Sequence, residues 1–271
     1  MVEPTAKQIF AYFGGKQSSA SRIVSMIPNH EHYIEPFSGG LAVFFRKPNA
    51  PWSCVNDLNQ DIANLYFCLS LPDVFPEIVH RLKWLIASRE IYDLADRMRK
   101  VEDFIIPNIE RATLYLFYIS NSFNQQIGSG FSDKSSNWDS KIVERLDVSR
   151  HKFNNTVVEN VDYAKLVKRY KNKPDAFWYI DPPYWITGKV PYYKHNFTAE
   201  NHIELKEQID ILHASGAKFL ISYDDIPEIR ELYKDYNVEP FLIRYGSNSE
   251  LKQEIVIKNY DTAIQSELEL E

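Results

Sequence analysis

The four residues Asp181, Pro182, Pro183 and Tyr184 combine hydrogen-bond acceptors with an aromatic ring. They follow the apolar, aromatic run 176–180, which predicts a buried strand that ends at the acid. Two prolines cannot continue a sheet, so they hold the Asp181 carboxylate and the Pro182 carbonyl on a stiff, extended turn. Two acceptors and a ring suit an exocyclic amine on a planar base, which has two N–H groups and a flat face. The alternative is an ordinary Pro-Pro loop in which Asp181 caps the next helix.

A glycine-rich turn follows another predicted strand. The run 33–37 predicts a short strand that leads through Ser38-Gly39-Gly40 into a helical pattern at 41–45. Strand, glycine-rich turn and helix together are typical of α/β proteins that bind a nucleotide or a nucleoside cofactor. The turn is not G-x-G-x-x-G, and no Lys-Ser/Thr pair follows the glycines, which excludes a P-loop. The carboxylate of Glu35 at the strand end favours a cationic cofactor over a phosphate-bearing one.

Acidic residues also end the next two predicted strands. Strand 53–57 ends in Asp57, about 20 residues after the first acid, a spacing suited to binding ribose hydroxyls. Strand 156–160 is followed by Asp162 and Tyr163, an acid and a ring that could hold an adenine. Either acid also fits the role of N-cap for the helix that follows it.

The segment Tyr12-Phe13-Gly14-Gly15-Lys16 places a lysine after two glycines and before a helix that opens at 18–21. Glycine allows close approach of the backbone to a ligand, but an ordinary turn before a helix has the same pattern.

The pattern changes to helices between residue 70 and about residue 154. Helical periodicity covers 74–85, 91–99 and 109–119, with no convincing strand, which predicts a helical insert outside the sheet. A loop at 121–131 ends this segment and is rich in amides, hydroxyls and glycines. Asparagine and glutamine pair with adenine edges and aromatic rings wedge between bases, although an exposed loop has the same composition. The candidate base-reading residues are Asn121, Phe123, Asn124, Gln125 and Gln126.

The last third of the chain predicts a helix at 199–214 capped by Thr198, a strand at 218–223, a helix at 227–233, and a hairpin of strands 238–245 and 253–260. Seven strands that alternate with helices and end in a hairpin predict a mostly parallel α/β sheet with one antiparallel strand. We therefore expect a catalytic domain at 1–69 and 155–271, and a helical target-recognition insert at 70–154.

Composition narrows the class of protein. The chain has 271 residues, of which 44% are hydrophobic and 14% aromatic, so a sizeable core is expected and disorder is not. Cys54 and Cys68 are the only cysteines and lie in no paired Cys/His motif, which argues against a disulfide framework or a structural zinc. Without a predicted signal peptide or membrane span, we expect a cytoplasmic protein. The net charge of −6 argues mildly against nucleic-acid binding, but basic residues cluster at 89–100 and 165–173.

Taken together, the motifs resemble those of the Dam-like (D12 class) DNA adenine-N6 methyltransferases over nearly the whole length. Each motif is short, and their order and spacing carry the resemblance. They are Tyr12 to Lys16, Glu35 to Gly40, Asn56 to Asn59, Asn121 to Asn124, Asp162-Tyr163, Asp181 to Tyr184, Phe197-Thr198 with His202, and Glu254 to Asn259.

The resemblance implies a Rossmann-like methyltransferase with a mixed seven-stranded sheet and a mostly helical inserted subdomain. It implies S-adenosylmethionine as methyl donor, double-stranded DNA as partner with a flipped-out adenine as acceptor, and no metal. By resemblance, Glu35-Pro36-Phe37-Ser38-Gly39-Gly40 holds the methionine part, Asp57 the ribose, and Asp162 with Tyr163 the cofactor adenine. Asp181 to Tyr184 hold the target base, with Asp181 also beside the cofactor. Tyr12 and Lys16 lie where both ligands meet.

Two departures from the family pattern stand out. Leu41 occupies a position where many relatives carry a third glycine, which we expect to alter packing without abolishing binding. The loop 125–131 lacks the arginine that relatives reading GATC carry, so the target sequence stays open. The alternatives are an N-methyltransferase acting on RNA or another substrate, or a non-catalytic binding relative. A restriction endonuclease partner or an orphan enzyme, and a monomer or a weak dimer, fit the sequence equally.

Overall fold

A computed structural model describes residues 6, 8–10, 12, 14–133, 138, 141–185, 197–244 and 251–261. The sequence also predicts a polar loop at 188–196; that loop and the turn of the predicted hairpin lie outside the described residues.

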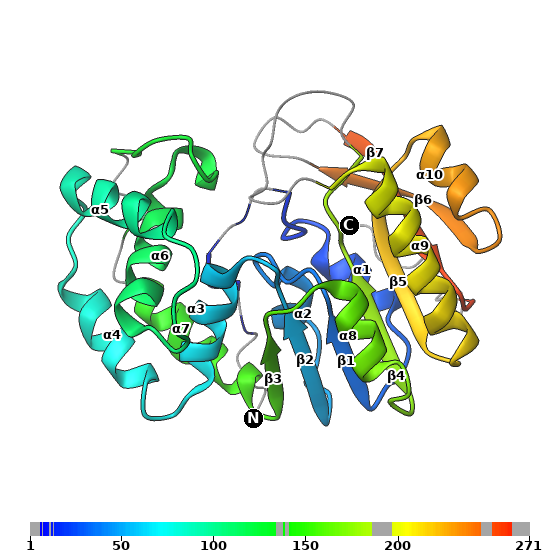
Figure 1. Cartoon of the computed structure of the whole chain (residues 1–271), viewed down its shortest axis with the longest axis horizontal. Coiled ribbons are helices and arrows are strands. Elements are labelled where there is room, and N and C mark those ends of the chain that lie inside the picture. The colour runs from blue at the N-terminus through cyan, green and yellow to red at the C-terminus, as the bar shows by residue number, and fades with distance from the viewer. Residues whose placement is uncertain are drawn as a thin grey trace, which may run out of the picture.

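A seven-stranded mixed sheet forms the centre of the molecule, in the order β3-β2-β1-β4-β5-β7-β6 (Figure 1). The pairs from β3 to β5 are parallel, and β7 lies antiparallel between β5 and β6. This arrangement confirms the predicted fold class, including the single antiparallel strand. The strands are β1 (His32–Glu35), β2 (Trp52–Asn56), β3 (Thr156–Glu159), β4 (Ala176–Ile180), β5 (Lys218–Asp224), β6 (Asn237–Arg244) and β7 (Leu251–Lys258).

Helices cover both faces of the sheet because its strands are apolar on both sides. In β4, Phe177 and Tyr179 face one layer while Trp178 and Ile180 face the other. The first layer contains α1 (Ala20–Met26), α2 (Ala42–Arg46) and α3 (Gln60–Ser70). The second contains α8 (Tyr163–Tyr170), α9 (Ala199–Ala214) and α10 (Pro227–Leu232).

The segment 70–154 contributes helices and no named strand among its described residues. Its elements are α4 (Phe75–Trp84), α5 (Arg89–Arg99), α6 (Ile109–Asn121), η1 (Phe123–Gln125), α7 (Lys141–Arg150) and η3 (His151–Phe153). Helix α7 was missing from the prediction, and an isolated bridge joins Ser122 to Phe131. The apolar core of the first layer continues into α4, α6 and α7. Figure 1 shows these helices on the β3 side of the sheet.

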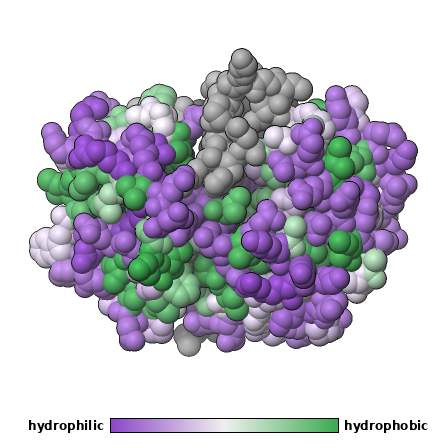
Figure 2. Space-filling model, in the orientation of Figure 1, coloured by the Kyte–Doolittle hydropathy of each residue, from purple (hydrophilic) through white to green (hydrophobic). Residues whose placement is uncertain are grey.

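The surface mixes charged and apolar residues (Figure 2). Several of the large exposed apolar side chains belong to the helical insert, including Trp84, Ile86 and Ile105. Within the described ranges, no single helix is long and apolar enough to cross a membrane, and only α3 and α4 taken together, across a 110° bend, pass that test.

Candidate functional site

The candidate site lies where the strand order reverses. Strands β1 and β4 are neighbours in the sheet. The chain leads from β1 to β2 on one side and from β4 to β5 on the other, so the two connections leave in opposite directions. Ligands of open α/β sheets bind at the carboxyl ends of the strands beside such a reversal. Glu35 is the last residue of β1 and Asp181 directly follows β4, so both predicted acids belong to this edge.

Lys16 joins the N-terminal segment to the turn after β4. Its Nζ donates to Asp181 Oδ1 at 2.8 Å and to the Tyr184 hydroxyl at 2.6 Å. It also lies 3.4 Å from the carbonyl oxygen of Gly14 and 4.7 Å from the centre of the Tyr184 ring. The lysine side chain is 3% exposed and Asp181 is 18% exposed, so this is a largely desolvated pair. The structure thus brings together two residues that the sequence places far apart.

Burial raises the pKa of Asp181 from its usual 3.8 to about 6. The Lys16 ammonium opposes that rise through its charge and its hydrogen bond, whereas the carboxylate of Glu254 adds to it. Glu254 lies on β7, is fully buried, and has Oε2 3.9 Å from Lys16 Nζ. Two carboxylates from different strands therefore flank one lysine.

Glu35 is a buried acid whose charged neighbours include Asp181 and Asp57. Burial raises its pKa well above the ordinary value, and the charges of Asp181 and Asp57 raise it further. Tyr33 opposes the shift by donating its hydroxyl to Glu35 Oε2 at 2.6 Å. The edge of the sheet is therefore electronegative, and a cation bound there would lower the cost of keeping these acids ionised.

Asp57 ties the glycine turn to the start of α3. One carboxylate oxygen accepts from the Gly39 N–H at 2.9 Å and the other from the Asn59 N–H at 2.8 Å. Burial raises its pKa to about 6, although these two hydrogen bonds lower it. The N-cap of α3 is Asn59, whose side chain accepts from the Asp61 N–H. The alternative of Asp57 as the cap was therefore wrong, because Asn59 takes that position.

The N-terminal segment packs closely on the two glycines of the turn. A Cβ on Gly40 would lie 1.9 Å from Gln8 Nε2, and one on Gly39 would lie 3.1 Å from the Tyr12 ring. The next residue, Leu41, has φ 56° and is buried, so a side chain occupies a left-handed conformation that favours glycine. Glycine would adopt this conformation at less cost, which agrees with the glycine that the family resemblance implies at this position.

Three rings gather beside the glycine turn. Phe37 lies 5.6 Å from Tyr163 and 6.0 Å from Phe197 between ring centres. Asp162 caps α8 by accepting from the Ala164 N–H at 2.8 Å, which is the alternative that the sequence left open. That bond uses one carboxylate oxygen and leaves the second as a candidate acceptor.

Asn56 and His202 were absent from the predicted site, yet both support it. The Asn56 amide donates to the carbonyls of Pro36 and Val161, so it fixes the turns after β1 and β3. His202 stacks on Trp185 at 4.7 Å, and its Nδ1 lies 2.5 Å from the Tyr223 hydroxyl. Burial lowers the pKa of His202 to about 4, so its ring is neutral at pH 7. Both residues belong to motifs that carry the family resemblance, and this was the available signal in the sequence. The contacts through which they support the site join distant parts of the chain.

The predicted base-reading loop is held by α5 and α6. The Gly128 N–H donates to the Tyr118 hydroxyl, and Ser129 Oγ donates to the Phe123 carbonyl. Phe123 is 51% exposed, and Gln125 and Gln126 are half-buried. Asn121 differs, because its amide is buried and donates to the Phe117 carbonyl, a placement that does not support a DNA contact. The Asn124 side chain lies outside what the structure describes. Figure 1 shows this loop at the same end of the molecule as the end of β4.

The residues at this edge fit a cationic nucleoside cofactor. Glu35 and Asp57 supply carboxylates, and Phe37 with Tyr163 supplies aromatic surface. The buried Ser38 hydroxyl makes no hydrogen bond within the described part of the chain, so it is an orphan donor in the glycine turn. Across the described ranges, no group of three or more His, Cys, Asp or Glu side chains could hold a metal ion.

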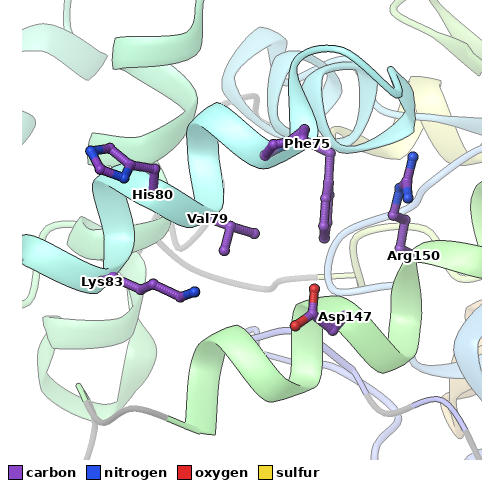
Figure 3. Close-up of a pocket in the computed structure, with 7 residues that line it drawn as sticks. Phe75, Val79, His80, Lys83, Asp147 and Arg150 are labelled. Atoms are coloured by element: carbon purple, nitrogen blue, oxygen red, sulfur yellow. The ribbon is translucent and has the colours of Figure 1, made fainter.

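A separate cavity of about 500 Å³ lies between α4 and α7 (Figure 3). Arg150 lies 5.0 Å from the Phe75 ring there, and the other labelled lining residues are Val79, His80, Lys83 and Asp147. None of the strand-end acids lines this cavity, so it is not part of the candidate site.

Comparison with known proteins identifies the family of the chain. The model of the D12 class N6 adenine-specific DNA methyltransferase family matches residues 12–242, which include every strand-end acid described above. The chain belongs to this family. Membership confirms the resemblance drawn from the motifs and indicates a DNA methyltransferase.

Three curated relatives of the family match nearly the whole chain. A Type II methyltransferase, M1.LlaDCHI, of Lactococcus lactis subsp. cremoris is 28% identical, over 91% of this chain and 93% of the relative. A DNA N-6-adenine-methyltransferase of Escherichia phage P1 is also 28% identical, over 90% of this chain but 34% of that longer protein. The Type II methyltransferase M.MjaIII of Methanocaldococcus jannaschii is 24% identical, over 94% of this chain and 99% of its own length.

Proposed function

We propose that the chain transfers the methyl group of S-adenosylmethionine to N6 of an adenine at a specific site in double-stranded DNA, with release of S-adenosylhomocysteine and of one proton from N6. The observation that carries this proposal is the contact of Lys16 with both Asp181, which is 18% exposed, and Tyr184, beside two further acids, Glu35 and Glu254. The hydrogen bond that Asp181 accepts from the Lys16 ammonium supports this role, because it is a bond from an N–H donor at the position proposed for the target amine.

The turn after β4 would activate the target amine. The lone pair of adenine N6 is delocalised into the ring, which makes N6 a poor nucleophile. The Asp181 carboxylate and the Pro182 carbonyl can accept its two N–H groups, which favours a tetrahedral nitrogen with a localised lone pair. Tyr184 would hold the base by stacking, and the fixed turn would supply positioning and electrostatic stabilisation.

The acids of β1 and β2 would bind the cofactor. When bound, S-adenosylmethionine supplies an electrophilic methyl group on a sulfonium cation. The carboxylate of Glu35 would attract the positively charged methionine part of the cofactor, and the segment Pro36 to Gly40 would also hold this part. Asp57 lies at the second strand end, where a ribose is expected, and Asp162 with Tyr163 at the third, where the adenine is expected. Tyr12 and Lys16 would lie between the two ligands.

The helical insert would position the DNA. An adenine paired inside a duplex is out of reach of Asp181, so it must leave the stack. The exposed Phe123 and the glutamines Gln125 and Gln126 are the candidates for reading bases. We further propose that residues 1–69 and 155–271 form the catalytic domain and that residues 70–154 form the target-recognition insert.

Product analysis tests this proposal. The purified chain is incubated with unmethylated duplex DNA and S-adenosylmethionine labelled in its methyl group, and the DNA is digested to nucleosides. We expect label in N6-methyladenine with the parent chain and none with the Asp181→Ala variant. Label in cytosine, in added RNA or in the protein itself, with none in adenine, would refute the assignment.

A further inference from the structure

Lys16 occupies Oδ1, one of the two carboxylate oxygens of Asp181 that could accept the target amine. An ammonium has three N–H donors, and those of Lys16 have acceptors in Asp181, the Tyr184 hydroxyl and the Gly14 carbonyl. The 2.8 Å bond to Asp181 has the length of a charge-assisted hydrogen bond. In the protein without substrate, the lysine therefore takes the place of the adenine amine on Asp181.

Entry of an adenine changes this arrangement. If its amine takes Oδ1 of Asp181, a Lys16 ammonium that is 3% exposed loses one of its acceptors in a largely desolvated position. Leaving a buried charged donor unsatisfied is costly. The amine also gains positive charge as the methyl group arrives, and an adjacent ammonium would oppose that charge.

Glu254 is placed to receive the lysine. It lies opposite Asp224 and Phe241 on the antiparallel strand β7, and its side chain is 0% exposed. Its Oε2 is 3.9 Å from Lys16 Nζ, which is an ion-pair distance but longer than a hydrogen bond. A movement of about 1 Å would bring the ammonium into hydrogen-bond range of this second carboxylate.

We infer that Lys16 guards Asp181 until an adenine amine arrives, and that Glu254 is a positioning residue that takes over Lys16 during that exchange. The inference rests on the proposed function, since it concerns how the same turn admits its substrate. Asp181 would then pass from one N–H donor to another without the lysine losing its charge partner.

A pair of DNA duplexes separates this role from a structural one. Both contain the sequence motif that the parent chain methylates, which is first identified by sequencing DNA methylated in vitro. One duplex has adenine at the target position, and the other has purine, which lacks the 6-amino group. Binding is measured by fluorescence anisotropy with S-adenosylhomocysteine, so that no methyl transfer occurs. Purine has no amine to displace Lys16, so only the adenine duplex should depend on Glu254.

For Glu254→Gln we expect adenine-duplex affinity to fall about tenfold, the scale of one lost charged hydrogen bond, with purine-duplex affinity unchanged. Glu254→Asp, which keeps the charge, should recover part of the loss. Glu239→Gln is the matched control, because Glu239 pairs with Lys258 on the same hairpin, and it should bind both duplexes as the parent does. An equal loss for both duplexes, or no loss for either, would overturn the inference.

Lys16→Met gives a second test that does not depend on how Glu254→Gln folds. Without the lysine, nothing competes for Asp181, so the adenine duplex should bind at least as tightly as to the parent at about pH 9, where Asp181 is ionised. Weaker adenine binding would contradict the guarding role. If the parent chain methylates no DNA motif at all, the proposed function is refuted. That result differs from a refutation of the role of Lys16 and Glu254, which requires a parent chain that methylates DNA.

Discussion

The Lys16→Met substitution tests the electrostatics of the site in depth. Asp181 must be ionised to accept the amine, so kcat/KM should fall as the pH drops through its pKa, which is about 6. Lys16 lowers that pKa through its charge and its hydrogen bond, and burial raises it. Removing the lysine therefore raises the pKa, and the acid limb of the pH–rate profile should move to higher pH.

The size of the shift follows from the 2.8 Å contact between Lys16 and Asp181. An opposite charge at such a distance typically changes a carboxyl pKa by about 1 to 3 units. With a shift of about 2 units, the ionised fraction of Asp181 at pH 7 falls from about 90% to about 10%. We therefore expect kcat/KM at pH 7 to fall about tenfold and to recover near pH 9.

The assay is kcat/KM for methyl transfer to DNA from about pH 5.5 to about pH 9.5, which reports the ionisation of the free enzyme. Lys258→Met is the matched control, since Lys258 is also buried but pairs with Glu239 instead of Asp181. It should leave the acid limb in place. If the acid limb of the kcat/KM profile of Lys16→Met stays at the parent's pH or moves to lower pH, the proposed effect of Lys16 on the pKa of Asp181 is refuted.

Three further predictions concern individual roles. Asp181→Ala should leave the affinity for S-adenosylmethionine within a few-fold but remove nearly all turnover, measured by calorimetry and by labelled methyl transfer; unchanged turnover would sink the assignment. Asp57→Ala should weaken cofactor binding about tenfold or more, the scale of a hydrogen bond to a charged group, and normal affinity in the same calorimetry would contradict its ribose role. Replacing Gln125 and Gln126 together by alanine should change the methylated motif, whereas an identical map in variant and parent would remove base reading from these two residues.

Much of the architecture follows from local signals. Helix α9 begins and ends at the predicted residues: Thr198 and Asn201 form a capping box at its start, and Gly216, with φ 83°, follows its C-cap Ser215. The strands were predictable because their β-branched and aromatic residues form short apolar runs bounded by acids and glycines. Helix α7 was missed because it is short and rich in charge, although Ile142 and Leu146 are buried one helical turn apart.

The contacts inside the site were harder to predict. Acids at strand ends are visible in the sequence, but the bond between Lys16 and Asp181 joins residues 165 positions apart. Glu254 belongs to β7, which follows β6 in the chain but lies beside β5 in the sheet. Its approach to Lys16 therefore depends on the topology of the whole sheet. The burial of Asn121 depends likewise on how α6 packs, and its residue type gave no sign of it.

Sequencing of DNA methylated in vitro tests the central claim most directly. Unmethylated genomic DNA is incubated with the purified chain and S-adenosylmethionine and then read by single-molecule sequencing, with Asp181→Ala treated in parallel. The account predicts N6-methyladenine at one short motif in the parent sample only, and that motif would also show whether the target is GATC. Unmodified adenines throughout, from a chain that still binds S-adenosylmethionine, would contradict it.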